Sequence, residues 1–213
     1  RAVSRAARLL AGSEGIIYDA EWAAPAEVAV VRPLTGEYFG NAAASENGKW
    51  VYQALTHAHI PVDALDEGFL LSEDLSRYKI IYISGSHIRR DAAARLATWV
   101  ESGGVLYTSG WGLARDEANQ PLEILQPALG LKSRGTMEMW GAVYGYGATR
   151  LPGIGKLKEA PAGAKVAARA SFAGAFGLKV GREVLDPNEG TEVLAAYDDG
   201  GAAVTRHPYG KGV

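Results

Sequence analysis

Residues 79–83, with the sequence Lys-Ile-Ile-Tyr-Ile, are the clearest candidate for a buried strand and decide the fold class of this chain. Short continuous runs of β-branched and aromatic residues are typical of strands covered on both faces, as in a parallel sheet. Three further segments are predicted as strands: 27–31 (Glu-Val-Ala-Val-Val), 60–65 (Ile-Pro-Val-Asp-Ala-Leu) and 105–108 (Val-Leu-Tyr-Thr).

Two segments between these strands have the apolar spacing of helices. Residues 41–59 and 91–101 each repeat small or apolar side chains at intervals of three and four. The connection 32–40 contains a proline and two glycines and predicts a loop, and the Gly103-Gly104 pair ends the second helix. Strands that alternate with helices predict an α/β fold, a flavodoxin-like doubly wound and mostly parallel sheet with helices on both faces.

The last part of the chain differs in composition and in its pattern of apolar residues. Residues 133–186 are rich in glycine and alanine and predict a β-rich or irregular insertion. Residues 191–197 and 202–207 flank an Asp-Asp-Gly-Gly sequence at 198–201. Aspartate and glycine adopt the positive φ values of tight turns, so this segment predicts a C-terminal β-hairpin.

The domain organisation follows from these segments. Residues 27–213 are predicted to form a single α/β domain, and residues 1–26 a docking helix and linker, with a basic helical face over 1–10. The chain starts without methionine or the apolar core of a signal peptide and ends in a glycine-punctuated segment. We therefore expect a fragment of a larger protein.

Composition excludes several classes of function. Of 213 residues, 47% are hydrophobic, which is sufficient for a substantial core, and the net charge of -2 gives no indication of nucleic acid or a membrane surface as partner. No apolar stretch approaches the ~20 residues of a membrane span. The absence of cysteine excludes disulfides and thiolate chemistry. A soluble protein is expected, either cytoplasmic or secreted to the periplasm or beyond.

Four ordered stretches resemble one known domain family. The sequence at 59–63 is similar to its "N-I-P-V-D", 75–79 to its "L-S-G-Y-K", 101–106 to its "E-A-G-G-T-L", and 203–212 to its closing "P-A-V-T-R-x-x-Y-G-K-G". The family is the trimerisation domain of family 42 β-galactosidases, which has the class I glutamine-amidotransferase-like (GATase-like) fold.

This resemblance covers residues 27–132 and 192–213 and implies a structural role. In the family, the domain packs beside a catalytic barrel and helps to build a trimer, and the catalytic glutamates lie on the barrel. The resemblance thus implies a non-catalytic oligomerisation domain of a glycoside hydrolase that acts in carbohydrate metabolism. The partners expected from the resemblance are the barrel and sister subunits, no cofactor is expected, and no catalytic residue carries over to this chain.

Ser109 is a weak candidate nucleophile and defines the third hypothesis, a serine hydrolase. It lies in the sequence Tyr-Thr-Ser-Gly-Trp-Gly at 107–112, near the position of the amidotransferase cysteine. A serine needs a histidine base and an orienting acid. The late histidine, His207, is followed by Pro208 and Tyr209 rather than by an acid, so this hypothesis ranks last.

The second hypothesis, ranked above the hydrolase, is a binding module for a sugar or an anion at the carboxyl edge of the sheet. Ser86, His87 and Arg89 follow the strand at 79–83, where open α/β sheets bind ligands, and Arg90 adds a second cation. Trp111 lies after the next strand and offers an aromatic face. The simpler interpretation is that Ser86 or His87 caps a helix and the arginines are solvated.

Other motifs indicate structure rather than chemistry. His57 and His59 are two residues apart and do not share a helical face, which argues against a metal pair. The acidic residues around 63–74 lack the pattern of a calcium loop, and the glycine pairs at 145–147 and 153–155 predict turns. Four aromatic residues have three possible roles, which are a platform for sugar stacking, a subunit contact and core packing: Trp111, Trp140, Tyr144 and Tyr146.

Overall fold

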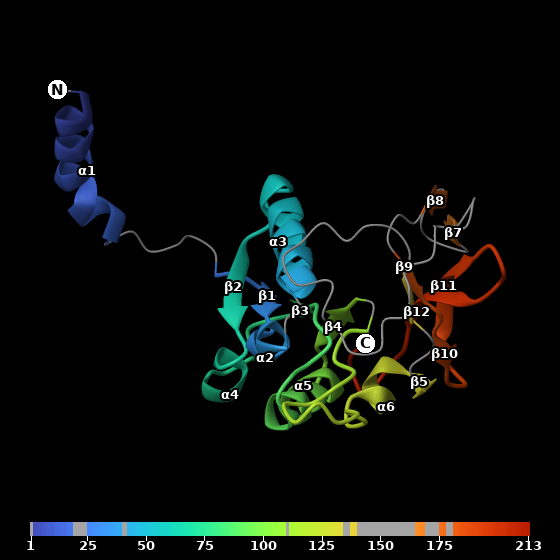
Figure 1. Cartoon of the computed structure of the whole chain (residues 1–213). Coiled ribbons are helices and arrows are strands. Elements are labelled where there is room, and N and C mark those ends of the chain that lie inside the picture. The colour runs from blue at the N-terminus through green and yellow to red at the C-terminus, as the bar shows by residue number, and fades with distance from the viewer. Residues whose placement is uncertain are drawn as a thin grey trace.

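A parallel sheet of four strands forms the centre of the computed structural model. The strands are β1 (Val28–Arg32), β2 (Val62–Asp66), β3 (Ile80–Ile83) and β4 (Val105–Thr108). They lie in the order β2-β1-β3-β4, all parallel, as Figure 1 shows. This is the start of the flavodoxin-like strand order, so the predicted fold class is confirmed.

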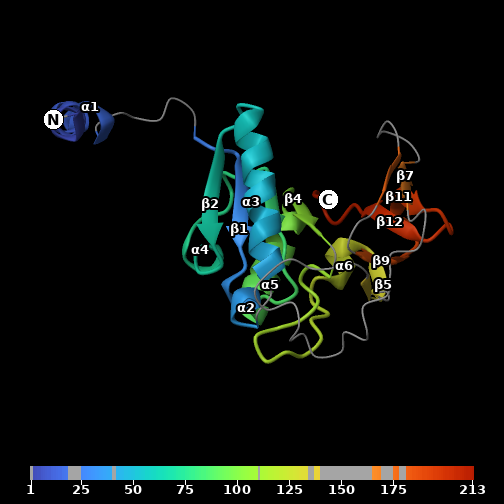
Figure 2. The same cartoon turned by 45° about the horizontal axis from the view of Figure 1, so that its top comes forward.

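Helices cover the two faces of this sheet. On one face, strand residues and residues of α5 (Arg90–Glu101) pack together and are at most 1% exposed: Ala29, Val31, Ile81, Ile83, Leu96 and Val100. Each of the larger side chains contributes roughly 1.5–3 kcal/mol by burial. On the other face α3 (Ala42–His57) lies along β1, where a Cβ at Gly48 would be 3.6 Å from Val30 (Figure 2).

Three helices of about one turn were not predicted from the sequence. They are α2 (Leu34–Tyr38), α4 (Phe69–Ser72) and α6 (Gln126–Leu129). A single turn contains too few residues to show a helical period, so the expected loop at 32–40 is in fact partly helical. Helix α6 ends at Gly130 with φ 65°, where a Cβ would lie 2.3 Å from the ring of His207.

The N-terminal helix α1 (Ala2–Tyr18) is longer than the predicted 1–10. It continues through two glycines, Gly12 and Gly15, neither of which has a neighbour within 4 Å of a Cβ position. The side chains of Val3 and Ile16 are 82% and 77% exposed. In Figures 1 and 2 the helix stands apart from the sheet, so docking through α1 stays a prediction.

The predicted C-terminal hairpin is confirmed. Strands β11 (Glu192–Tyr197) and β12 (Ala202–Arg206) pair antiparallel, and Gly200 supplies the positive φ of the turn at 89°. With β7 (Lys165–Ala168) and β8 (Ala175–Gly177) they form a second sheet in the order β12-β11-β7-β8.

Short strand pairs occupy the described parts of the predicted insertion and its borders. They are β5 (Leu131–Ser133) with β10 (Asp186–Pro187) and β6 (Met137–Met139) with β9 (Gly181–Glu183). The structure describes residues 2–18, 25–39, 42–109, 111–133, 137–139, 165–168, 175–177 and 181–213. The predicted turns at 145–147 and 153–155 and the aromatic residues Trp140, Tyr144 and Tyr146 lie outside these ranges.

The last residues return to the edge of the central sheet. Val213 donates its N–H to the carbonyl of Gly104 at 3.1 Å and accepts the N–H of Leu106 at 2.8 Å. This alternation is the parallel ladder pattern, so Val213 extends the sheet beside β4. Within the described residues, no helix is long and apolar enough to cross a membrane.

Candidate functional site

A buried carboxylate organises the loops at the carboxyl edge of the sheet. Glu67, only 2% exposed, accepts hydrogen bonds from the backbone N–H and the hydroxyl of Thr35, both at 2.9 Å, and from the N–H of Arg89 at 2.6 Å. These partners belong to α2, which follows β1, and to the loop after β3, while Glu67 follows β2. The carboxylate oxygens therefore hold together the segments that follow β1, β2 and β3, which is a structural role.

Ser86 and His87 are brought together at this edge, and both are buried. The Nδ1 of His87 lies 2.8 Å from the hydroxyl of Ser86, and Nε2 lies 3.0 Å from the amide oxygen of Asn119. The ring also stacks on Phe39 at a centroid distance of 4.1 Å. Burial lowers the pKa of His87, so the ring is a neutral, hydrogen-bonded support of the loop that carries Asn119.

The two arginines after His87 are held by nearby carboxylates. Arg89 pairs with Asp91 at 2.6 Å, and Arg90 pairs with the buried carboxylate of Asp116. The hydrogen bond from Arg89 lowers the pKa of Asp91. Arg89 thus points to its own helix N-terminus and does not meet Ser86, His87 and Trp111 in one site.

Ser109 donates a hydrogen bond to the hydroxyl of Ser84 at 2.9 Å. Among the described residues no histidine is hydrogen-bonded to it: His87 is engaged as above, and Nδ1 of His207 lies 2.9 Å from the hydroxyl of Thr191. The base that a serine hydrolase needs is therefore not in place beside Ser109 in this part of the chain.

The loop after β4 holds Trp111 in an unusual backbone conformation. Trp111 and Leu113 have φ values of 56° and 59°, which cost roughly 1–3 kcal/mol each in residues other than glycine. Between them, a Cβ at Gly112 would lie 1.7 Å from the hydroxyl oxygen of Thr108. The Trp111 N–H donates to the carboxylate of Glu183, which is 5% exposed. The surrounding structure thus fixes this strained loop.

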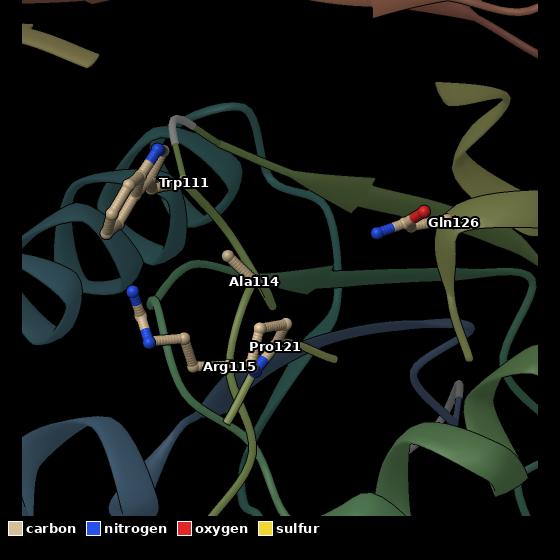
Figure 3. Close-up of a pocket in the computed structure, with 5 residues that line it drawn as sticks. All are labelled: Trp111, Ala114, Arg115, Pro121 and Gln126. Carbon is tan, nitrogen blue, oxygen red and sulfur yellow. The ribbon is translucent and has the colours of Figure 1, made fainter. Parts of the chain in front are cut away.

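The side chain of Trp111 forms one wall of a hollow of about 180 Å³. The remaining lining residues are Ala114, Arg115, Pro121 and Gln126. In Figure 3 the indole and the Arg115 guanidinium lie on one side, and the amide of Gln126 points toward them from the other. The guanidinium carbon of Arg115 is 5.7 Å from the centre of the Trp111 ring, within cation–π range.

The polar groups of the hollow are only partly used. One nitrogen of Arg115 donates to the carbonyl of Asn119 at 2.8 Å. The indole Nε1 of Trp111 and the hydroxyl of Thr108 are buried without a hydrogen-bond partner among the described residues. Buried polar atoms of this kind are uncommon in proteins. These two atoms are covered, so the polar groups that face the hollow are those of Arg115 and Gln126, beside the aromatic face of Trp111.

The sequence indicated Trp111 as a ligand residue but not Arg115 or Gln126. These two come from an irregular loop and from the single-turn helix α6, so neither has a periodic pattern around it. In the described part of the chain no group of three or more histidines and acids is placed to hold a metal. The chemistry available in the hollow is thus stacking and hydrogen bonding.

The fold and this site define an α/β domain of the doubly wound class with an aromatic hollow near the carboxyl edge of its sheet. No family model and no curated protein matches the sequence. Several solved structures are similar in fold. Two are β-galactosidases, from Rahnella sp. R3 and from Bacillus circulans sp. alkalophilus, each with a TM-score of 0.66 at 22% and 20% identity. An exo-β-1,4-mannosidase from Opitutaceae bacterium strain TAV5 has a TM-score of 0.54 at 19% identity.

Each match covers most of this chain but only a small part of the similar protein. Each covers 88% of this chain but only 27% of the two β-galactosidase chains and 30% of the mannosidase chain. This chain thus spans about a quarter of the length of these β-galactosidases. At such identities the likeness establishes the fold of one part of these larger proteins.

Proposed function

We propose that this chain is a non-catalytic structural and oligomerisation domain of a glycoside hydrolase of the β-galactosidase kind. The observation that carries the proposal is the match of 88% of this chain to only 27% of two β-galactosidase chains. The sequence stretches that resemble the trimerisation domain of family 42 support the same role. In the proposed arrangement, the domain packs beside a catalytic barrel and joins sister subunits into a homo-oligomer, a trimer as in the resembled family.

An apolar surface on the α3 face of the sheet supports the oligomerisation role. Val105 and Tyr107 of β4 pair in register with Ile80 and Tyr82 of β3 and point to the side of the sheet on which α3 lies. Helix α3 lies along β1, so it does not extend over β4, which lies to the side of the helix in Figure 2. Val105 and Tyr107 are 38% and 45% exposed.

Helix α3 also carries exposed aromatic residues. Trp50 is 61% exposed and Tyr52 is 37% exposed. Aromatic side chains are enriched at the centres of protein interfaces, and contiguous exposed apolar patches mark interaction sites. We define the α3–β4 surface as Trp50, Tyr52, Val105 and Tyr107 and propose it as the subunit contact.

The test is the solution mass by light scattering over a concentration series. The wild-type chain is expected to associate as its concentration rises, and Trp50→Glu is expected to remain monomeric, because a charge in the interface must be desolvated. Tyr38→Glu is the control, since Tyr38 is an aromatic residue of α2 that is 88% exposed. A monomeric wild type at every concentration contradicts an oligomerisation role for the isolated domain, and unchanged association of Trp50→Glu contradicts the assigned surface.

A further inference from the structure

We propose that the hollow beside Trp111 binds one neutral sugar ring, which stacks on the indole and receives hydrogen bonds from Arg115 and Gln126. This site is independent of the oligomerisation role, because the hollow does not include any residue of the α3–β4 surface. A pyranose ring has an apolar face of C–H groups and a rim of hydroxyls. The hollow offers the complementary groups, an aromatic wall and donors at its margin.

The donors are free to act on a ligand. Arg115 has five N–H groups, and one of its nitrogens donates to the carbonyl of Asn119. No ion pair joins Arg115 to a carboxylate in the part of the chain that the structure describes. The amide of Gln126 points into the hollow in Figure 3 and can both donate and accept, as sugar hydroxyls do.

The apolar walls favour a sugar over an inorganic anion. Ala114, Pro121 and the indole supply most of the lining, and Arg115 is the single cation among the residues that line it. Phosphate and sulfate sites in proteins gather several charged or backbone donors around the oxygens. One cation beside an aromatic plane instead suits a neutral ring with dispersed hydroxyls.

The size of the hollow limits the ligand to one ring. Its volume of about 180 Å³ is below the roughly 300–1,000 Å³ of sites for drug-sized ligands. The lining side chains are half-buried, except for the exposed Pro121, so the hollow reaches the surface. A single sugar, or the terminal sugar of a longer chain, is therefore the class of ligand that fits.

The indole is held in place before any ligand arrives. Its backbone N–H is fixed by the buried carboxylate of Glu183, and Gly112 packs against Thr108 with no space for a side chain. A fixed aromatic plane loses little conformational entropy when a ligand stacks on it. Strained backbone of this kind is concentrated at functional sites, which supports a ligand here.

The test is a titration of the ¹⁵N-labelled chain with galactose, mannose and methyl β-galactoside, followed by the indole N–H signals. The chain has five tryptophans, and Trp111→Phe assigns the signal of Trp111. We expect this signal to shift saturably with at least one sugar, with a Kd of about 1–10 mM, as is reasonable for a small polar ligand. The signal of Trp50 on α3 should not move.

Three variants separate binding from folding. Trp111→Ala lacks the indole signal, so its titration is followed by the side-chain amide signal of Gln126, and binding is expected to weaken at least tenfold. Gln126→Ala, which removes a side chain without a hydrogen bond in the described structure, is expected to weaken binding several-fold. Trp50→Ala is the matched control and should bind as the wild type does. The proposal is overturned if no sugar gives a saturable shift up to about 100 mM, if Trp111→Ala and Gln126→Ala bind normally, or if only an acidic sugar such as galacturonate binds.

Discussion

The carboxylate of Glu67 accepts the backbone N–H of Arg89 at 2.6 Å and so joins the loop after β2 to the loop after β3. The same carboxylate accepts two hydrogen bonds from Thr35 in α2, the helix after β1. Ligand sites of doubly wound sheets lie at this edge. In this chain Glu67 and His87 are buried at this edge, after β2 and β3. The hollow lies to one side of them, at the loop after β4.

We expect Glu67→Gln to lower the free energy of unfolding by about 2–4 kcal/mol, because a glutamine turns an N–H donor toward donors that need an acceptor. Urea denaturation measures the change. The control is Glu73→Gln, since Glu73 is exposed and a change there should stay within about 0.5 kcal/mol. Equal stability of the two variants would mean that the three segments are held by other contacts.

Stability should also depend on pH through His87. Its pKa is lowered first by burial and then by the positive charge of Arg115, while Asn119 and Asp116 act in the opposite direction. The unfolded chain therefore takes up a proton on this histidine at a higher pH than the folded chain does. Stability contributed by neutral His87 is present above about pH 6.5 and falls as the pH decreases below it, until the folded histidine is itself protonated.

The measurement is the urea midpoint between pH 8 and about 5, above the range in which most carboxylates titrate. His87→Gln should flatten the curve in this interval, since glutamine does not ionise. His57→Gln, a change at the exposed end of α3, should leave the slope as it is. A slope that persists in His87→Gln would assign the dependence to another group.

The central sheet could be predicted from the sequence because each strand is a short apolar run bounded by a turn or a helix. Residues 105–108 were predicted with the bounds that β4 has, and the Asp-Asp-Gly-Gly turn predicted the hairpin of β11 and β12. Apolar runs and turn sequences are local signals, so they can be recognised without knowledge of the tertiary structure.

The site could be predicted only in part. Trp111 was indicated by its place after a strand, but its partners depend on contacts between distant segments. Glu183, on β9, is 72 positions away and holds the Trp111 backbone. Arg89 was predicted as a ligand residue, whereas Asp91 pairs with it two positions later. Sequence spacing does not distinguish a cation that is available from one held by its neighbour.

The contact between Glu183 and Trp111 makes a further prediction about the hollow. Glu183→Ala should speed up hydrogen exchange of the Trp111 amide by about tenfold or more, because it removes the acceptor of this N–H and lets the strained φ relax. Hydrogen exchange resolved by NMR measures the rate, and the exposed residue Glu189 provides the control Glu189→Ala. The amide of Val31, in the core of β1, reports global stability. If the Val31 and Trp111 amides accelerate equally, Glu183 stabilises the whole domain. If Trp111 alone accelerates, Glu183 specifically positions the indole, and sugar affinity should fall in the same variant.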